Sequence, residues 1–171
     1  MRILALFLGS LLLAAAEPPP VVPQVDLARY MGTWHEVARL PNRFQRGCGC
    51  TSATYTLRED GRVSVLNQCR TPGKNKAVRG WAKVVDRSTN AKLKVTFFWP
   101  FFGDYWVLAL DPDYRWVLVG TPNRKYLWVL SRTPRLEEAT LRGLLERAQT
   151  LGFDTSRILR TEPCDPPLSP R

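Results

Sequence analysis

The chain has 171 residues, of which 44% are hydrophobic and 11% aromatic, and this length is enough for one hydrophobic core of ordinary size. The 23% of charged residues and the 14 scattered prolines exclude coiled coils and collagen, while the aromatic content argues against extensive disorder. The formal net charge is +10, but the basic residues form no block of five, so a solvated surface is favoured and no nucleic-acid partner is expected. His35 is the only histidine, which excludes catalysis by two histidines and histidine-rich metal sites.

Residues 1–16 are predicted to be a secretory signal peptide. Arg2 is followed by an uncharged apolar run that ends in three alanines, which fits the small residues required by signal peptidase. The run is shorter than the roughly 20 residues of a membrane-spanning helix. A lipid anchor in the outer membrane is not expected, because no cysteine precedes Cys48. We therefore expect a soluble, secreted or periplasmic chain that begins near Glu17, with an uncleaved N-terminal anchor as the alternative.

The next segment, residues 17–25, is a proline-rich lead-in, after which Asp26 is placed to cap a single helical turn over residues 27–30. From there the chain consists of short, β-branched and aromatic runs separated by turn residues, such as Asp60-Gly61 and Pro72-Gly73. Eight strands are predicted, over residues 33–40, 51–57, 62–69, 78–86, 92–99, 105–110, 116–120 and 126–132.

Eight short strands joined by tight turns predict an all-β fold, an eight-stranded antiparallel up-and-down barrel of the calycin type. Closure of the sheet removes its unpaired edges, and eight strands leave an interior that can hold one small ligand. After Pro134 the apolar residues recur with a helical period up to Ala148, and Gly152 is a good helix stop. The chain is thus predicted to be one domain over residues 26–164, with a C-terminal α-helix packed outside the barrel and a tail over residues 165–171.

All four cysteines lie in the part of the chain that is expected to be exported. An even number of cysteines in an oxidising compartment predicts two disulfides. The spacing of Cys48 and Cys50, with one intervening residue and no nearby histidine, is poor for zinc. We therefore expect no metal site and no cofactor.

Three motifs, in this order along the chain, resemble those of the lipocalin family. Gly32-Thr33-Trp34 is similar to the Gly-x-Trp signature of that family, and residues 111–114 resemble its second conserved region. Residues 130–134 resemble the third region, whose arginine, here Arg132, packs over the signature tryptophan at the closed end of the barrel. Longer matches over residues 30–39, 97–101 and 126–134 resemble the branch of bacterial lipocalins and apolipoprotein D. The resemblance covers roughly residues 25–164. Bacterial members are commonly outer-membrane lipoproteins, and this chain lacks their anchoring cysteine.

The resemblance also implies a disulfide pairing. Cys50 stands where this branch pairs a cysteine with one that follows the helix, here Cys164. Cys48 and Cys69 are then left for each other. The swapped pairing stays open, because Cys48 and Cys50 are only two residues apart.

A lipocalin barrel has no chemistry of its own, and the resemblance implies binding and transport or storage of a small lipophilic ligand, a fatty acid or a lysophospholipid. No catalytic residues are expected. In this branch of the family, cavity-facing positions correspond to four residues of this chain: Tyr55, Asn67, Phe97 and Trp128. Strand alternation counted back from Arg132 adds Leu130 and Tyr126 to the inner face.

Strand alternation counted forward from Trp34 places Glu36, Ala38 and Leu40 on the inner face and His35 on the outer face. The apolar members of the predicted lining have core packing as their alternative role. Glu36 and Asn67 would be buried polar groups, which need either a structural hydrogen bond or a ligand headgroup.

Two rival functions remain from the sequence. One is a lipocalin-type enzyme acting on a lipid or an isoprenoid, which would need a free thiol or an internal acid. The other is an interaction module that docks its basic surface and the loop Phe101-Phe102-Gly103 on a membrane or another protein. The sequence leaves open whether this loop is exposed or closes the pocket.

Overall fold

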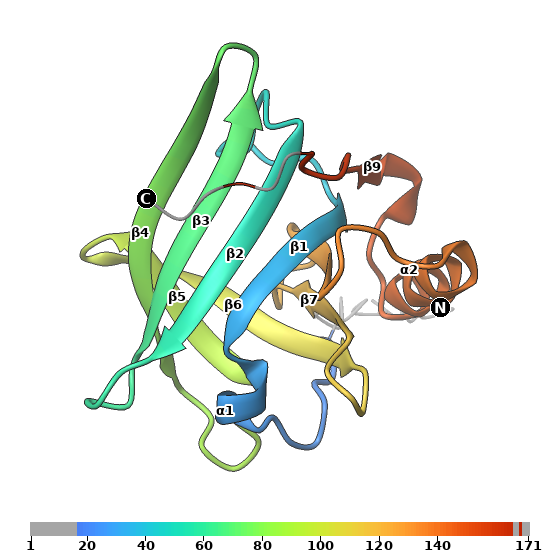
Figure 1. The fold of residues 1–171 in the computed structure, drawn as a ribbon. Coiled ribbons are helices and arrows are strands. Elements are labelled where there is room, and N and C mark those ends of the chain that lie inside the picture. Colours follow the sequence, from blue (N-terminus) through green and yellow to red (C-terminus); the bar gives the residue numbers. More distant parts are fainter. Residues whose placement is uncertain (1–16, 166–167, 169–171) are drawn as a thin grey trace, which may run out of the picture.

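An antiparallel sheet that closes on itself forms the body of the computed structural model, which describes residues 17–165 and 168 (Figure 1). The elements in chain order are α1 (Leu27–Tyr30), β1 (Gly32–Arg39), β2 (Cys50–Leu57), β3 (Val63–Thr71), β4 (Lys74–Val84), β5 (Lys92–Phe98), β6 (Phe101–Leu110), β7 (Trp116–Gly120), β8 (Leu127–Ser131), α2 (Glu138–Thr150), the 3-10 turn η1 (Thr155–Arg157) and β9 (Leu159–Arg160). All eight predicted strands form, as β1 to β8, so the predicted fold class is confirmed. The expected signal peptide, residues 1–16, lies outside the described residues, as do residues 166, 167 and 169–171 of the expected tail.

β1 closes the barrel because its two halves pair with different strands. Residues 32–35 pair with β2, and residues 35–39 pair with β8. The short strand β9, which the sequence did not predict, pairs with the end of β1 beyond β2. The other strands pair with their neighbours in sequence.

This meander sends successive links to opposite ends of the barrel. The links β1–β2, β3–β4, β5–β6 and β7–β8 share one end, which we call the mouth. The links β2–β3, β4–β5 and β6–β7 share the other, which we call the closed end. α1 precedes β1 at the closed end, opposite the projecting β3–β4 hairpin (Figure 1).

The helical turn α1 has the cap that the sequence predicted. The Asp26 carboxylate accepts hydrogen bonds from the backbone N–H groups of Ala28 and Arg29, at 2.9 and 3.2 Å. These bonds satisfy donors that a helix start leaves unpaired. The cap thus fixes the chain direction just before the signature residues of β1.

α2 packs on the outside of the barrel (Figure 1). Its buried side chains, Leu141, Leu144 and Ala148, belong to an apolar cluster with residues of the outer face, among them Leu118 and Val129. Gly152, at φ +86°, follows the helix end as predicted. A second apolar cluster fills the inside of the barrel and includes Trp34, Tyr55, Val65, Leu93 and Leu130. The sheet therefore has a buried inner face and, under α2, a buried outer face.

Two disulfides are present, Cys48–Cys69 and Cys50–Cys164, which is the pairing that the family resemblance implied. The first joins the β1–β2 loop to β3 near the mouth. The second ties the segment after β9 to the start of β2. The swapped pairing is therefore wrong.

The predicted inner-face positions of Ala38 and Leu40 are wrong. The register between β1 and β8 shifts between Glu36 and Ala38, so an extra residue of β1 reverses the alternation. Ala38 pairs with Val129, and both residues lie in the outer cluster under α2, as does Leu40. Arg39, which pairs with Trp128, takes the inner position instead.

The segment Phe101-Phe102-Gly103, which the sequence treated as a loop, is the start of β6. The link between β5 and β6 is therefore only two residues long, Trp99 and Pro100. Among the described residues, no helix combines the length and the apolar character needed to cross a membrane.

Candidate functional site

The closed end is sealed around Trp34, which is fully buried. The indole N–H of Trp34 donates to the backbone oxygen of Tyr30 at 2.9 Å. The Arg132 guanidinium lies 3.9 Å from the indole ring centre and donates to the backbone oxygens of Thr33 and Arg29. A side chain at Gly32, which has φ +94°, would come within 3.2 Å of that guanidinium. The predicted set Gly32, Trp34 and Arg132 thus forms one structural seal.

Three tyrosines line the inside of this closed end. The Tyr105 hydroxyl is hydrogen-bonded to the hydroxyl of Tyr30 at 2.7 Å and to that of Tyr55 at 3.2 Å. Desolvation by burial raises the pKa of all three phenols well above the usual value. Tyr55, a predicted ligand residue, is 8% exposed in this cluster and forms the bottom of the barrel interior.

Higher on the inner wall, Glu36 is at the centre of a buried polar network. Its carboxylate accepts hydrogen bonds from Arg39 and from the Thr161 hydroxyl, both at 2.6 Å, and from the Gln45 amide at 2.5 Å. Glu36 is 4% exposed and Arg39 is 7% exposed. Buried charges of this kind are stable only when paired and hydrogen-bonded, as the Glu36 carboxylate and the two terminal nitrogens of Arg39 are here.

The β1–β2 loop, residues 40–49, folds over the mouth and is held by this network. Gln45 also accepts a hydrogen bond from the indole N–H of Trp128 at 2.9 Å. Next to it, the Phe44 ring lies 5.3 Å from that of Tyr126 and 6.4 Å from that of Trp128. Tyr126 and Trp128 are themselves stacked at 5.9 Å. Two predicted ligand residues, Tyr126 and Trp128, are thus brought together by a loop that the sequence did not assign to the site.

The opposite inner wall carries Asn67, Val78 and Phe97. Asn67 pairs across the sheet with Ala53 and Val78, and Ala53 pairs with Trp34, so all of these residues share the inner face. Val78 is nevertheless 46% exposed. Within the described residues, the Asn67 side-chain oxygen is buried and has no hydrogen-bond partner.

Phe97 also lies on this wall, because its ring covers the inner face of Gly80. A Cβ atom at Gly80 would lie 2.7 Å from a carbon of that ring. Phe97 is 36% exposed. Solvent therefore reaches apolar side chains of the inner face near the mouth, whereas the inner-face residues at the closed end are buried.

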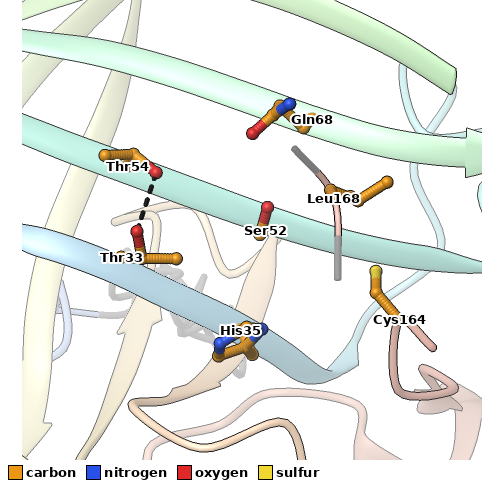
Figure 2. Close-up of a pocket in the computed structure, with 7 residues that line it drawn as sticks. All are labelled: Thr33, His35, Ser52, Thr54, Gln68, Cys164 and Leu168. Carbon is orange, nitrogen blue, oxygen red and sulfur yellow. Dashed lines mark hydrogen bonds between the residues drawn. The ribbon is translucent and has the colours of Figure 1, made fainter. Parts of the chain in front are cut away.

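A separate groove of about 300 Å³ lies on the outer face of β1, β2 and β3. Figure 2 shows its lining, which includes Thr33, His35, Ser52 and Gln68 of the strands and Leu168 of the C-terminal segment. His35 faces outward, as predicted, and burial lowers its pKa. None of the predicted ligand residues lines this groove. The described part of the chain also contains no group of three or more His, Cys, Asp or Glu placed to hold a metal ion.

Sequence reasoning missed four residues of the inner site: Arg39, Phe44, Gln45 and Thr161. Arg39 was missed because the bulge in β1 reverses its direction. Thr161 belongs to the segment after β9, which has no detectable strand pattern. Phe44 carried no specific signal, since single apolar residues are common in surface loops.

This chain is similar to a known protein family and to solved structures over most of its length. The family model of a lipocalin-like domain matches residues 25–163. Among solved structures, insecticyanin from the tobacco hornworm Manduca sexta has a similar fold, with a TM-score of 0.71 and 22% identity, over 90% of this chain and 87% of that chain.

Three curated relatives are similar over most of their length. Temperature-induced lipocalin-1 of Arabidopsis thaliana is 46% identical, over 86% of this chain and 84% of that protein. The outer membrane lipoprotein Blc of Escherichia coli K12 is 41% identical, over 93% of this chain and 96% of that protein. Apolipoprotein D of Mus musculus is 33% identical, over 91% of this chain and 86% of that protein.

Proposed function

Because this chain belongs to the lipocalin family, which binds small hydrophobic ligands, we propose that its barrel binds a fatty acid or a lysophospholipid for transport or storage. The observation that carries the proposal is the contrast along the inner face. The closed end is packed, whereas Val78 and Phe97 of the inner face remain accessible to solvent near the mouth. An apolar ligand that covers such surface is stabilised by about 0.8 kcal/mol for each methylene removed from water.

The proposed acyl chain lies against Trp128, Leu130 and Phe97, with Tyr126 at its upper end and Tyr55 below it. Its headgroup stays near the mouth, where Asn67 and the Glu36 network supply the polar groups of the inner wall. Ala38 is not part of this set, because it lies in the outer cluster. A long acyl chain in such an interior reaches micromolar affinity or better after the entropy cost of binding.

Two observations favour binding over the rival enzymatic function. All four cysteines are in disulfides, so no free thiol is available as a nucleophile. Glu36 is the acid that faces the interior, and three donors already occupy its carboxylate. Its hydrogen bonds therefore favour a structural role in holding the 40–49 loop.

We also propose that the protein is exported to a secreted or periplasmic location. The apolar segment at residues 3–16 and the two disulfides support this proposal, since disulfides persist in oxidising compartments. The Escherichia coli relative is an outer membrane lipoprotein by name. The intact mass of the mature protein tests the proposal: we expect a chain that begins near Glu17 without an acyl group, and an acylated or uncleaved chain would contradict it.

The ligand is tested by native mass spectrometry of protein purified from its own host, followed by titration with a fluorescent fatty acid. We expect one lipid per chain. Trp128→Ala should weaken fatty-acid binding by about 1–3 kcal/mol, because it removes apolar contact area. Trp81→Ala is the matched control, since Trp81 is paired with outward-facing Thr96 and packs on Phe102 outside the barrel.

Equal binding by the parent and Trp128→Ala would remove Trp128 from the site. Absence of any bound lipid, both in the purified protein and after addition of fatty acid or lysophospholipid, would overturn the proposed function.

A further inference from the structure

The two-residue link between β5 and β6 presents three large apolar side chains to solvent at the mouth. Phe98 is 82% exposed, and Trp99 and Phe101 are each 76% exposed. These are the three most exposed large apolar side chains among the described residues. We call Phe98, Trp99 and Phe101 the aromatic tip. Clustered exposure of this kind marks a surface that contacts an apolar partner.

The other three links at the mouth are basic. Five exposed cations lie in or beside them: Arg43 and Arg46 in the β1–β2 loop, Lys74 and Lys76 in the β3–β4 hairpin, and Lys125 in the β7–β8 turn. The mouth segments, residues 40–49, 70–78, 97–102 and 121–126, contain no Asp or Glu. Beside these segments lies Glu162, whose backbone N–H donates to the backbone oxygen of Gly49 at 3.2 Å, so the aromatic tip belongs to an end of the molecule with an excess of positive charge.

The closed end has a balanced charge. Its three links, residues 58–62, 85–91 and 111–115, contain four basic and five acidic residues. Several of these are paired, as Arg58 is with Asp60 and Arg115 with Asp111. The net charge of +10 is therefore unevenly distributed between the two ends of the barrel, and its excess lies at the end that carries the aromatic tip.

We propose that the mouth docks on the surface of an anionic phospholipid bilayer, with the aromatic tip inserted at the level of the headgroups and the lysines and arginines around it on lipid phosphates. Trp and Phe are favoured at that depth, and each Lys or Arg close to an anionic bilayer raises partitioning about fivefold. Docking in this orientation places the open end of the barrel against the bilayer. Docking in itself does not depend on the proposed function. Its purpose, the transfer of a lipid between the bilayer and the barrel, does rest on that function.

The same charges disfavour a second copy of this chain as the occupant. Two mouths that face each other would bring an excess of like charges together, since the four mouth segments contain no carboxylate and Glu162 beside them supplies only one. The aromatic tip is also a narrow projection on one hairpin rather than a flat face, and a soft headgroup layer accommodates such a shape.

The test is co-sedimentation of the purified protein with vesicles of phosphatidylcholine, with or without phosphatidylglycerol. We expect binding to the anionic vesicles only, and its loss in about 1 M salt, where the Debye length is about 3 Å. Trp99→Ser with Phe101→Ser should lower partitioning about tenfold or more, because it removes the inserted apolar area. Val85→Ser, at an apolar side chain that is 49% exposed at the closed end, should leave it unchanged.

A second set of variants tests the role of the basic residues. Lys74→Glu with Lys76→Glu should lower partitioning of the protein onto anionic vesicles about 25-fold or more. Its control, Arg58→Glu with Arg87→Glu, makes the same charge change at the closed end and should have little effect on partitioning. All variants should bind a fluorescent fatty acid in vesicle-free solution as the parent does. A parent that docks but binds no fatty acid would overturn the proposed function and leave docking intact.

Three outcomes would overturn docking. The first is docking that does not depend on charge, seen as equal binding of the parent to neutral and anionic vesicles or as equal loss in the two charge variants. The second is self-association in sedimentation velocity that disappears in the Trp99→Ser, Phe101→Ser variant, which would assign the tip to a second copy. The third is retention on heparin without vesicle binding, which would assign the basic mouth to a polyanion.

Discussion

At the closed end of the barrel, Trp34, Tyr30 and Tyr55 are all less than 10% exposed and held by ring contacts and hydrogen bonds, whereas at the mouth Phe44 is 60% exposed and the aromatic tip 76% or more. Both ends are rich in aromatic residues, but only the closed end uses them as core. The mouth is held by two disulfides and by the Glu36 network instead. The closed end is thus stabilised by packing and the mouth by cross-links and a polar network, so that truncating an aromatic side chain should cost more stability at the closed end than at the mouth.

The largest expected effect comes from the covalent links near the mouth. Cys50–Cys164 joins residues 114 apart in sequence and Cys48–Cys69 joins residues 21 apart. In the chain-entropy account, the longer loop contributes about 5 kcal/mol to the free energy of unfolding and the shorter about 3 kcal/mol. Guanidinium denaturation of Cys50→Ala with Cys164→Ala, against Cys48→Ala with Cys69→Ala, should show this order. Equal losses, or the reverse order, would contradict a mouth held by chain cross-linking.

The next effect concerns the seal of the closed end. Trp34→Ala should lower the free energy of unfolding by about 3–5 kcal/mol, because it leaves a cavity in a fully packed cluster and removes the surface on which Arg132 rests. Trp128→Ala should cost clearly less, since Trp128 is only half-buried. The free energies of unfolding of the two variants are compared by chemical denaturation, with equal m values, the slopes against denaturant concentration, as the condition for a direct comparison. If the two variants lose the same stability, the two ends do not differ in the way described.

The smallest effect on stability is a dependence on alkaline pH. Burial raises the pKa of Tyr30, Tyr55 and Tyr105, so the folded state keeps its protons when the unfolded state begins to lose them near pH 10. The contribution of these phenols to the free energy of unfolding is thus fully present below about pH 10 and is lost as the pH rises towards the raised pKa values.

Denaturation measured across this alkaline range checks the sign. Tyr55→Phe with Tyr105→Phe should flatten the decline, because two of the three phenols no longer titrate. A parent protein whose stability stays constant above pH 10, or a variant that declines as steeply, would show that the tyrosine cluster is not desolvated.

Much of the fold follows from local rules that the sequence displays. The alternation and turn residues predict β1 to β8, the Asp26 cap predicts α1, and the period change with Gly152 predicts α2 and its end. The Trp34–Arg132 seal and the disulfide pairing required the family resemblance, because spacing alone does not bring distant residues together.

The site was less accessible to sequence reasoning, for two physical reasons. One extra residue in β1 reverses every side chain beyond it, which moves Ala38 out and Arg39 in, and no local pattern marks that bulge. The polar network depends on Gln45 and Thr161, which reach Glu36 from a loop and from the C-terminal segment. Contacts between segments this far apart depend on the closed barrel and are not encoded in any one stretch.

The most direct test of the division between the two ends is quenching of tryptophan fluorescence by a fatty acid that carries bromine on its acyl chain. Bromine quenches only an indole that it contacts, and of the inward-facing tryptophans Trp34 is sealed below the tyrosines whereas Trp128 is half-buried on the upper inner wall. The account predicts strong quenching in the parent and in the outer-face control Trp81→Phe, and loss of most of that quenching in Trp128→Phe. Undiminished quenching in Trp128→Phe, with its loss in Trp81→Phe, would place the ligand outside the barrel and contradict the account.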